Sequence, residues 1–195
     1  MLGGGFMGRV HSRAARSAGA VLDSVASSRP ERSAQAAAEL GFETSASASE
    51  LLERSFDAVH ICTPNDVHAA QSLQALDAGS NIICEKPLAT DSTDARAVLA
   101  RADEAGLLGT VPFVYRFHPM VREARARFAE GQAGTLLTVD AGYLQDWLLA
   151  SGDENWRVES ERGGPSRAFA DIGSHLVDLI EFIVGDRISS LVATT

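Results

Sequence analysis

The sequence predicts an α/β protein in which a doubly wound parallel sheet is followed by part of a second, α+β domain. Over roughly the first 116 of the 195 residues, short apolar runs alternate with amphipathic helical segments, a pattern typical of βαβ units. A glycine-rich turn, Gly3–Gly8, opens the first of these units. After about residue 117 the alternation stops. At roughly 150 residues per domain, the length accommodates one complete domain and part of another.

Residues 1–116 are expected to hold alternating strands and helices, most of which have a recognisable start or stop. Pro30 suits the first position of a helix, and Gly41 suits its end. Ser47 and Glu50 have capping-box spacing, and Ser92 can cap a later helix. The expected strands are the stub Met1–Leu2 and residues 21–26, 57–62, 81–84 and 109–114, and the expected helices are 6–18, 30–40, 47–53, 66–77 and 92–105.

Residues 117–195 follow a different pattern and are interpreted as the beginning of a second domain. An Arg-rich helix is expected over 118–130 and another over 171–184, separated by an irregular stretch at 145–169. Strands are expected over 135–144 and 188–193, although the remaining sequence supplies no partner for either. The predicted domains are therefore 1–116 and 117–195.

Composition excludes several classes of function. Seventeen basic against twenty-six acidic side chains give a net charge of −9, which argues against nucleic acid or an anionic membrane surface as a partner. No apolar stretch approaches the ~18 residues of a membrane span, and the glycine cluster argues against interpreting the Arg-containing N-terminus as a transit peptide. Cys62 and Cys84 are too few for a disulfide framework, and as reduced thiols they favour a cytoplasmic location.

The glycine-rich turn has the spacing of a dinucleotide-binding loop. Gly3, Gly5 and Gly8 fit G-x-G-x-x-G between a strand and a helix, with Phe6 and Met7 inside the same loop. The first glycine allows the tight turn, the second lets the backbone approach a pyrophosphate, and the third lets helix and strand pack closely. The phosphates would then bind the N–H groups at the start of the helix.

The end of the second strand bears on the choice of cofactor. A carboxylate at that point would bind the ribose hydroxyls of NAD, but this chain has Ser27, Ser28 and Arg29 there. Two hydroxyls and a guanidinium suit a 2′-phosphate, so NADP is favoured and NAD remains possible. The alternative is a solvated loop that only leads into the next helix.

Glu85-Lys86-Pro87 follows the strand at 81–84, where residues face the ligand crevice of an open α/β sheet. Lys86 is the only lysine, whereas the other sixteen basic residues are arginines. A buried lysine can exchange protons, which an arginine cannot do. Lys86 is therefore a candidate catalytic residue, and the alternative is a surface lysine on a turn.

Asp171 and His175 are four residues apart, so on a helix they project from one face. A carboxylate beside an imidazole fixes its tautomer and stabilises its charged form, as a general acid/base requires. A metal site with Asp178 as third ligand, and a purely structural pair, are the alternatives. Among the other histidines, His60 is expected in the core, while His11 and His68 border the cleft or pack.

Several motifs together resemble one known family. Gly3–Gly8 with His11, Thr63-Pro64-Asn65 with His68, Glu85-Lys86-Pro87, Tyr115–Pro119 and Gly163–His175 occur in one order. In that order and spacing they resemble the Gfo/Idh/MocA family of oxidoreductases over essentially the whole chain. The resemblance implies a Rossmann-like domain followed by a substrate domain, whose open antiparallel sheet often joins subunits into a homo-oligomer.

The resemblance also implies an activity and a set of site residues. Members mostly transfer a hydride between NAD or NADP and a secondary alcohol of a sugar, inositol or similar polyol. The catalytic residues would be Lys86, Asp171 and His175: His175 takes the hydroxyl proton, Lys86 stabilises charge on oxygen, and Asp171 positions both. Cofactor contacts would come from Gly3, Gly5, Phe6, Met7, Gly8, Ser27, Ser28, Arg29, Thr63, Pro64, Asn65, His68, Glu85 and Lys86, and substrate contacts from Lys86, Tyr115, Arg116, Trp156, Arg157, Asp171 and His175.

Two departures from the family pattern shape the expectations. Ser27 replaces the acidic residue of NAD-using members, which supports NADP. The chain is also shorter than the family pattern at both ends, because only Met1–Leu2 precede the glycines and most of the second sheet should follow residue 195. A chain of this length is expected to be incomplete. The hypotheses are therefore a dehydrogenase, a catalytically silent nucleotide-binding or assembly protein, and a metal-dependent hydrolase using Asp171, His175 and Asp178.

Overall fold

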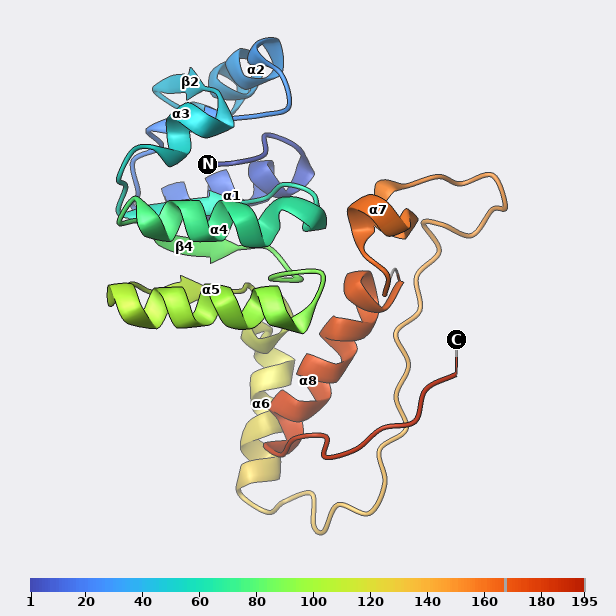
Figure 1. Cartoon of the computed structure of the whole chain (residues 1–195). Coiled ribbons are helices and arrows are strands. Elements are labelled where there is room, and N and C mark those ends of the chain that lie inside the picture. Colours follow the sequence, from blue (N-terminus) through green and yellow to red (C-terminus); the bar gives the residue numbers. More distant parts are fainter. Residues whose placement is uncertain (167, 195) are drawn as a thin grey trace.

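The N-terminal part of the chain is a layered α/β domain, as Figure 1 shows for this computed structural model, which describes residues 1–166 and 168–194. In that view α4 and α5 lie on the near side of the strands and α1 lies on the far side. The helices are α1 (Phe6–Ser17), α2 (Pro30–Leu40), α3 (Ala48–Leu52), α4 (His68–Asp77) and α5 (Ser92–Ala105), and the strands are β1 (Ser24–Ala26), β2 (Thr44–Ala46), β3 (Ala58–Ile61), β4 (Asn81–Cys84) and β5 (Gly109–Thr110). The predicted doubly wound arrangement is confirmed.

The strands are parallel throughout, as a βαβ chain requires. β1 pairs with β2, and β3, β4 and β5 form the other group in that order. Leu2 forms parallel bridges to Ala26 of β1 and Ile61 of β3, so the expected strand stub Met1–Leu2 joins the two groups. The chain runs from this stub into the glycine-rich turn, and because the strands are parallel, the loops that follow them lie at the same edge of the sheet.

The core between strands and helices is mainly apolar. Leu51 and Ile61 are fully buried, and Leu76 is 1 % exposed. Local signals that the sequence predicted are present: Ser47 and Glu50 form the reciprocal capping box, and Gly41 ends α2 with a left-handed φ of 73°.

Three details of the N-terminal part differ from expectation. Ser92 does not cap α5; the carboxylate of Asp91 instead accepts hydrogen bonds from the backbone N–H groups of Thr93 and Asp94. The strand expected over 109–114 is only two residues long, because it pairs with β4 at its first two residues and then leaves the sheet. β2 was not expected, since its polar sequence Thr44–Ala46 gives no apolar run.

The C-terminal part contains α6 (Pro119–Ala129), α7 (Ser160–Gly163) and α8 (Ser174–Val184), the last preceded by a π-helical turn at Phe169–Gly173. α6 and α8 lie side by side in Figure 1, and they pack against each other. The predicted strands at 135–144 and 188–193 are wrong, because both segments are extended without strand pairing in the structure. A strand needs a partner for its backbone hydrogen bonds, and the described residues supply none for either.

None of the helices in the described part of the chain is long and apolar enough to cross a membrane.

Candidate active site

A cleft of about 1010 Å³ lies where the strands of the α/β domain end. Its walls are the glycine-rich turn, the loops after β1, β3 and β4, and residues of the C-terminal part. Ligands of open α/β sheets bind at this edge, outside the carboxyl ends of the strands. The cleft is therefore the candidate active site.

The glycine-rich turn is shaped for a phosphate group. A Cβ at Gly3 would lie 2.4 Å from the carbonyl oxygen of Cys62, and one at Gly8 would lie 2.0 Å from that of Gly3. Neither position accepts a side chain. A Cβ at Gly5 would meet no atom within 4 Å, so the missing side chain leaves open space at the start of α1. Phe6 and Met7 also line the cleft, and the turn fits the pyrophosphate of a dinucleotide.

The loop after β1 reaches the cleft with all three of its predicted residues, Ser27, Ser28 and Arg29. The hydroxyl of Ser33, which is 2 % exposed, accepts a hydrogen bond from the N–H of Ser27 at 2.8 Å and donates one to the carbonyl of Arg29 at 3.2 Å. The loop is thereby fixed to α2. The sequence did not single out Arg32, which lines the same wall one helical turn away.

The loop after β3 connects the two parts of the chain. The side-chain amide of Asn65 donates a buried hydrogen bond of 3.0 Å to the carbonyl oxygen of Gly163, at the end of α7. His68, 1 % exposed, has its ring nitrogens 2.8 Å from the carbonyl oxygen of Thr63 and 2.7 Å from that of Pro87. Thr63, Pro64, Asn65 and His68, the predicted cofactor contacts of this loop, all line the cleft, and His68 holds its two neighbouring loops together.

Lys86 and Asp171 form an ion pair across the cleft. The ammonium of Lys86 lies 3.0 Å from the Asp171 Oδ1, and it also donates to the Asp171 carbonyl oxygen. Their side chains are only 13 % and 16 % exposed. Arg157 approaches the same carboxylate oxygen at 3.4 Å. The only lysine is therefore a nearly buried residue of the site and not a surface lysine on a turn.

His175 faces the same cleft from the first turn of α8. The rings of Phe113 and Tyr115 meet it edge-to-face, with centroids 5.7 and 5.0 Å away. Burial, followed by the positive charge of Lys86, holds the pKa of His175 below its ordinary value of 6.5, so the ring is neutral near pH 7. Its Nδ1 is buried without a hydrogen-bond partner among the described residues.

Asp171 does not form the expected side-chain pair with His175. Both residues line the cleft. The hydrogen bonds of Asp171 to described residues, however, go to Lys86 and not to the imidazole. The π-helical turn that contains Asp171 ends just before α8 begins, so the two residues do not share one regular α-helix. Asp171 therefore acts on His175 through its charge. That charge raises the pKa of the ring, whereas burial and the charge of Lys86 lower it by more.

Arg116 lies elsewhere than expected. Its guanidinium binds the carboxylate of Asp178, with Nε 2.9 Å from Oδ2, and it is not among the residues that line the cleft. Asp178 was the third ligand in the metal-site alternative, and its carboxylate is bound by Arg116 instead. Among the described residues there is no group of three or more His, Cys, Asp or Glu side chains arranged to hold a metal.

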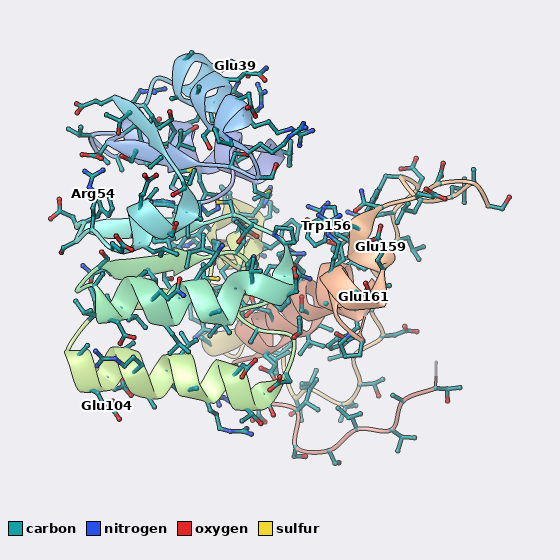
Figure 2. The ribbon with its side chains drawn as sticks, turned by 45° about the horizontal axis from the view of Figure 1, so that its top comes forward. Glu39, Arg54, Glu104, Trp156, Glu159 and Glu161 are labelled. Atoms are coloured by element: carbon teal, nitrogen blue, oxygen red, sulfur yellow. The ribbon has the colours of Figure 1, made fainter. Side chains whose placement is uncertain are left out.

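The other predicted substrate residues, Tyr115, Trp156 and Arg157, do line the cleft. Figure 2 shows Trp156 between the α/β domain and α7. The sequence did not identify Tyr143 or Gln145, which reach the same wall from the extended segment after α6. The hydroxyl of Tyr143 bonds that of Tyr115, and burial raises its pKa to about 12. Tyr143 lies in the strand expected over 135–144 and Gln145 in the irregular stretch that follows, and neither carried a signal of a site in the sequence.

Comparisons with known proteins agree with this geometry. Residues 1–113 match the model described as "Oxidoreductase family, NAD-binding Rossmann fold", and residues 121–195 match the GFO/IDH/MocA C-terminal domain. Levoglucosan dehydrogenase of Pseudarthrobacter phenanthrenivorans is 36 % identical over 201 residues, covering 95 % of this chain and 50 % of that protein.

Solved structures give the same result. An oxidoreductase domain protein from Kribbella flavida matches with a TM-score of 0.88 and 40 % identity, over 95 % of this chain and 53 % of that one. A levoglucosan dehydrogenase in complex with NADH and levoglucosan matches with a TM-score of 0.88 and 34 % identity, over 95 % and 53 %. The chain thus spans about half the length of these relatives. It belongs to the Gfo/Idh/MocA family of oxidoreductases.

Proposed function

We propose that the protein transfers a hydride between NADP, or NAD, and a secondary alcohol of a sugar, inositol or similar polyol. One observation carries the proposal: the Lys86–Asp171 pair and the neutral imidazole of His175 share a cleft with a glycine turn that fits a pyrophosphate. The relatives named above include a dehydrogenase of a sugar derivative, which supports the same class of substrate.

The chain's residues account for the proton transfer. His175, neutral near pH 7, accepts the proton of the substrate hydroxyl at Nε2, because Nδ1 is buried. The ammonium of Lys86 donates a hydrogen bond to the same oxygen and stabilises the negative charge that develops on it. Asp171 holds that ammonium in place. The nicotinamide cofactor, when bound, supplies the hydride acceptor for alcohol oxidation.

Four side chains are suited to the rest of the polyol. Tyr115 and Tyr143 present hydroxyls, Arg157 presents a guanidinium, and Trp156 offers an aromatic face, and all four are part of the wall of the cleft. The guanidinium of Arg157 lies 4.6 Å from the centre of the Trp156 ring, which orients both groups. Such a wall suits a substrate with several hydroxyl groups.

NADP is the cofactor we favour. Arg29 and Arg32 line the wall beside Ser27 and Ser28, and two guanidinium groups beside hydroxyls suit a 2′-phosphate. The levoglucosan dehydrogenase structure, by contrast, holds NADH. This loop is therefore where we expect the protein to differ from that relative.

We further propose domains at 1–116 and 117–195, a cytoplasmic location and a homo-oligomer. The family models meet between residues 113 and 121, near the proposed boundary. Both cysteines are free, as in a reducing compartment. Exposed apolar side chains such as Leu137, Leu144 and Leu191 provide surface for a subunit contact, which sedimentation analysis of the purified protein would test.

The test of the proposed function is NADPH or NADH formation at 340 nm with a panel of sugars and inositols. Lys86→Ala and His175→Ala should each lower kcat at least about 100-fold while cofactor binding persists. Binding can be followed by tryptophan fluorescence, because Trp156, one of the two tryptophans, lines the cleft. Arg101→Ala, which removes an exposed ion pair with Asp77, is the control for charge removal.

The outcomes separate the candidate functions. Cofactor binding without turnover of any alcohol would favour the silent nucleotide-binding protein. Absence of binding to both NADP and NAD would refute the proposal altogether. A metal-dependent hydrolase would instead lose activity with a chelator, but Arg116 already occupies the carboxylate of Asp178 that such a site would need.

A further inference from the structure

Residues 155–164, which we call the wall segment, bring Trp156 and Arg157 to the cleft. The segment consists of a 3₁₀ turn at Trp156–Val158 followed by the short helix α7. The chain between α6 and this turn forms neither helix nor strand. Ordering an irregular stretch costs conformational entropy, so the wall segment needs contacts elsewhere in the fold to keep Trp156 and Arg157 in place.

The side-chain amide of Asn65 supplies such a contact from the α/β domain. Asn65 is 7 % exposed, and its Nδ2 donates the 3.0 Å hydrogen bond to the carbonyl oxygen of Gly163. A carbonyl oxygen can only accept, so this position requires an N–H donor. In Figure 1, α7 lies beside the start of α4, close to the turn that contains Asn65.

The loop that carries Asn65 is itself fixed. His68, three residues further on, lies between the carbonyl oxygens of Thr63 and Pro87. The hydroxyl of Thr63 donates a hydrogen bond of 2.6 Å to the side-chain oxygen of Gln71 on α4. The amide of Asn65 is therefore presented from a well-held part of the α/β domain.

Gly163 passes the contact on to the residues that face the cleft. A Cβ at Gly163 would lie 2.3 Å from the carbonyl oxygen of Arg157 and 3.0 Å from that of Trp156. The backbone of Gly163 therefore packs directly on the backbone of both residues. Asn65 reaches Trp156 and Arg157 through this one intervening residue.

The next residue, Gly164, packs on a second loop of the α/β domain. A Cβ at Gly164 would lie 3.0 Å from Cγ2 of Thr90. Thr90 belongs to the loop after β4, which also brings Glu85 and Lys86 to the cleft. The wall segment thus rests on two loops that border the cleft, and Asn65 adds a buried hydrogen bond to that contact.

We propose that Asn65 is a positioning residue for substrate binding, which holds the wall segment so that Trp156 and Arg157 face the polyol. The inference rests on the proposed function for the identity of the substrate, whereas the position of the wall does not. Without the amide donor, the buried carbonyl of Gly163 loses this partner, and the wall segment is in place in only a fraction of the molecules. The affinity for substrate falls by that fraction.

The direct test follows the fluorescence of Trp156 in the complete protein without ligand. Trp147→Phe leaves Trp156 as the only tryptophan. In this background Asn65→Asp keeps the shape of the side chain but removes the donor. It should shift the Trp156 emission to longer wavelength and increase its quenching by acrylamide.

Gly163→Ala displaces the wall from the other side and should give the same changes, because its Cβ does not fit beside the Arg157 carbonyl. Gly163 is not among the residues that line the cleft, so its replacement should leave NADP affinity at the wild-type value. The matched control is Gly152→Ala, since a Cβ at this exposed glycine would meet no atom within 4 Å.

Kinetics separate substrate positioning from a general loss of structure. Asn65→Asp and Gly163→Ala should each raise KM for the alcohol roughly 5- to 30-fold, the effect of leaving one buried carbonyl unpaired. They should change kcat less than about threefold, because Lys86 and His175 lie outside the wall segment. A merely structural role would instead reduce the amount of folded enzyme and leave KM unchanged.

Unchanged Trp156 emission and quenching in folded Asn65→Asp protein would overturn the inference. Increased quenching without a rise in KM would overturn the role in substrate binding. If Asn65→Asp does not fold, Gly163→Ala decides by the same measurements. A wild-type protein that turns over no alcohol would refute the proposed function, and the fluorescence would still show whether Asn65 holds the wall.

Discussion

Arg29 provides the sharpest test of how the cleft selects its cofactor. In the proposed function its guanidinium binds the 2′-phosphate of NADP, and NAD has no group at that position. Arg29 is exposed, so the contact is partly screened by solvent. Hydrogen bonds to charged groups contribute about 1.5–3 kcal/mol, and exposure reduces this to about 1–2 kcal/mol. Arg29→Ala should therefore weaken NADP binding roughly 5- to 30-fold.

The assay is titration of Trp fluorescence with NADP and with NAD at two salt concentrations. Affinity for NAD should change less than about twofold, and the loss for NADP should shrink at high salt, because screening weakens exposed ionic contacts. Arg13→Ala is the matched control, since Arg13 is an exposed arginine of α1 outside the cleft. Equal losses for both cofactors, or a wild-type protein that already prefers NAD, would refute the reasoning.

Three further predictions concern the site and its support. Asp171→Asn should lower kcat at least about 100-fold and move the pH profile down, since Asp171 holds Lys86 and raises the pKa of His175. Between pH 6.5 and about 4, His60 takes up a proton in the unfolded chain but not in the folded one, so the free energy of unfolding should fall by about 2 kcal/mol over this range. In urea titrations His60→Gln should remove this loss. Gly8→Ala should abolish measurable cofactor binding, because its Cβ would lie 2.0 Å from a carbonyl oxygen of the turn.

Local features of this fold were predictable because they depend on neighbouring residues. The capping box at Ser47 and Glu50, the end of α2 at Gly41 and the glycine turn each need only a few positions in sequence. Whether strands form at 135–144 and 188–193 could not be predicted from neighbouring residues. Their apolar content is right for strands, but a strand also needs a partner at some other point of the chain, and that partner determines whether it forms.

The same distinction applies to the site. Lys86, Asp171 and His175 could be named from their residue types and positions, but their contacts could not. Asp171 is 85 positions from Lys86, and its carboxylate turned out to bind the ammonium and not the nearby imidazole. The contact of His11 with Glu85 spans 74 positions. No periodicity in the sequence reports such distances, because they depend on how the sheet edge and the C-terminal part come together.

The contact between the two parts of the chain is better explained by function than by stability. Lys86 and Asp171 are only 13 % and 16 % exposed, so both charges lose most of their hydration. A buried ion pair often contributes little net stability, because desolvation offsets its Coulomb energy. An apolar contact at this point would join α8 and the loop after β4 equally well. It would not, however, provide a fixed ammonium beside a neutral imidazole, and neither part of the chain contains both groups. The cleft therefore depends on the contact for its chemistry, and the amide of Asn65 on Gly163 supplies a second, uncharged connection between the same two parts.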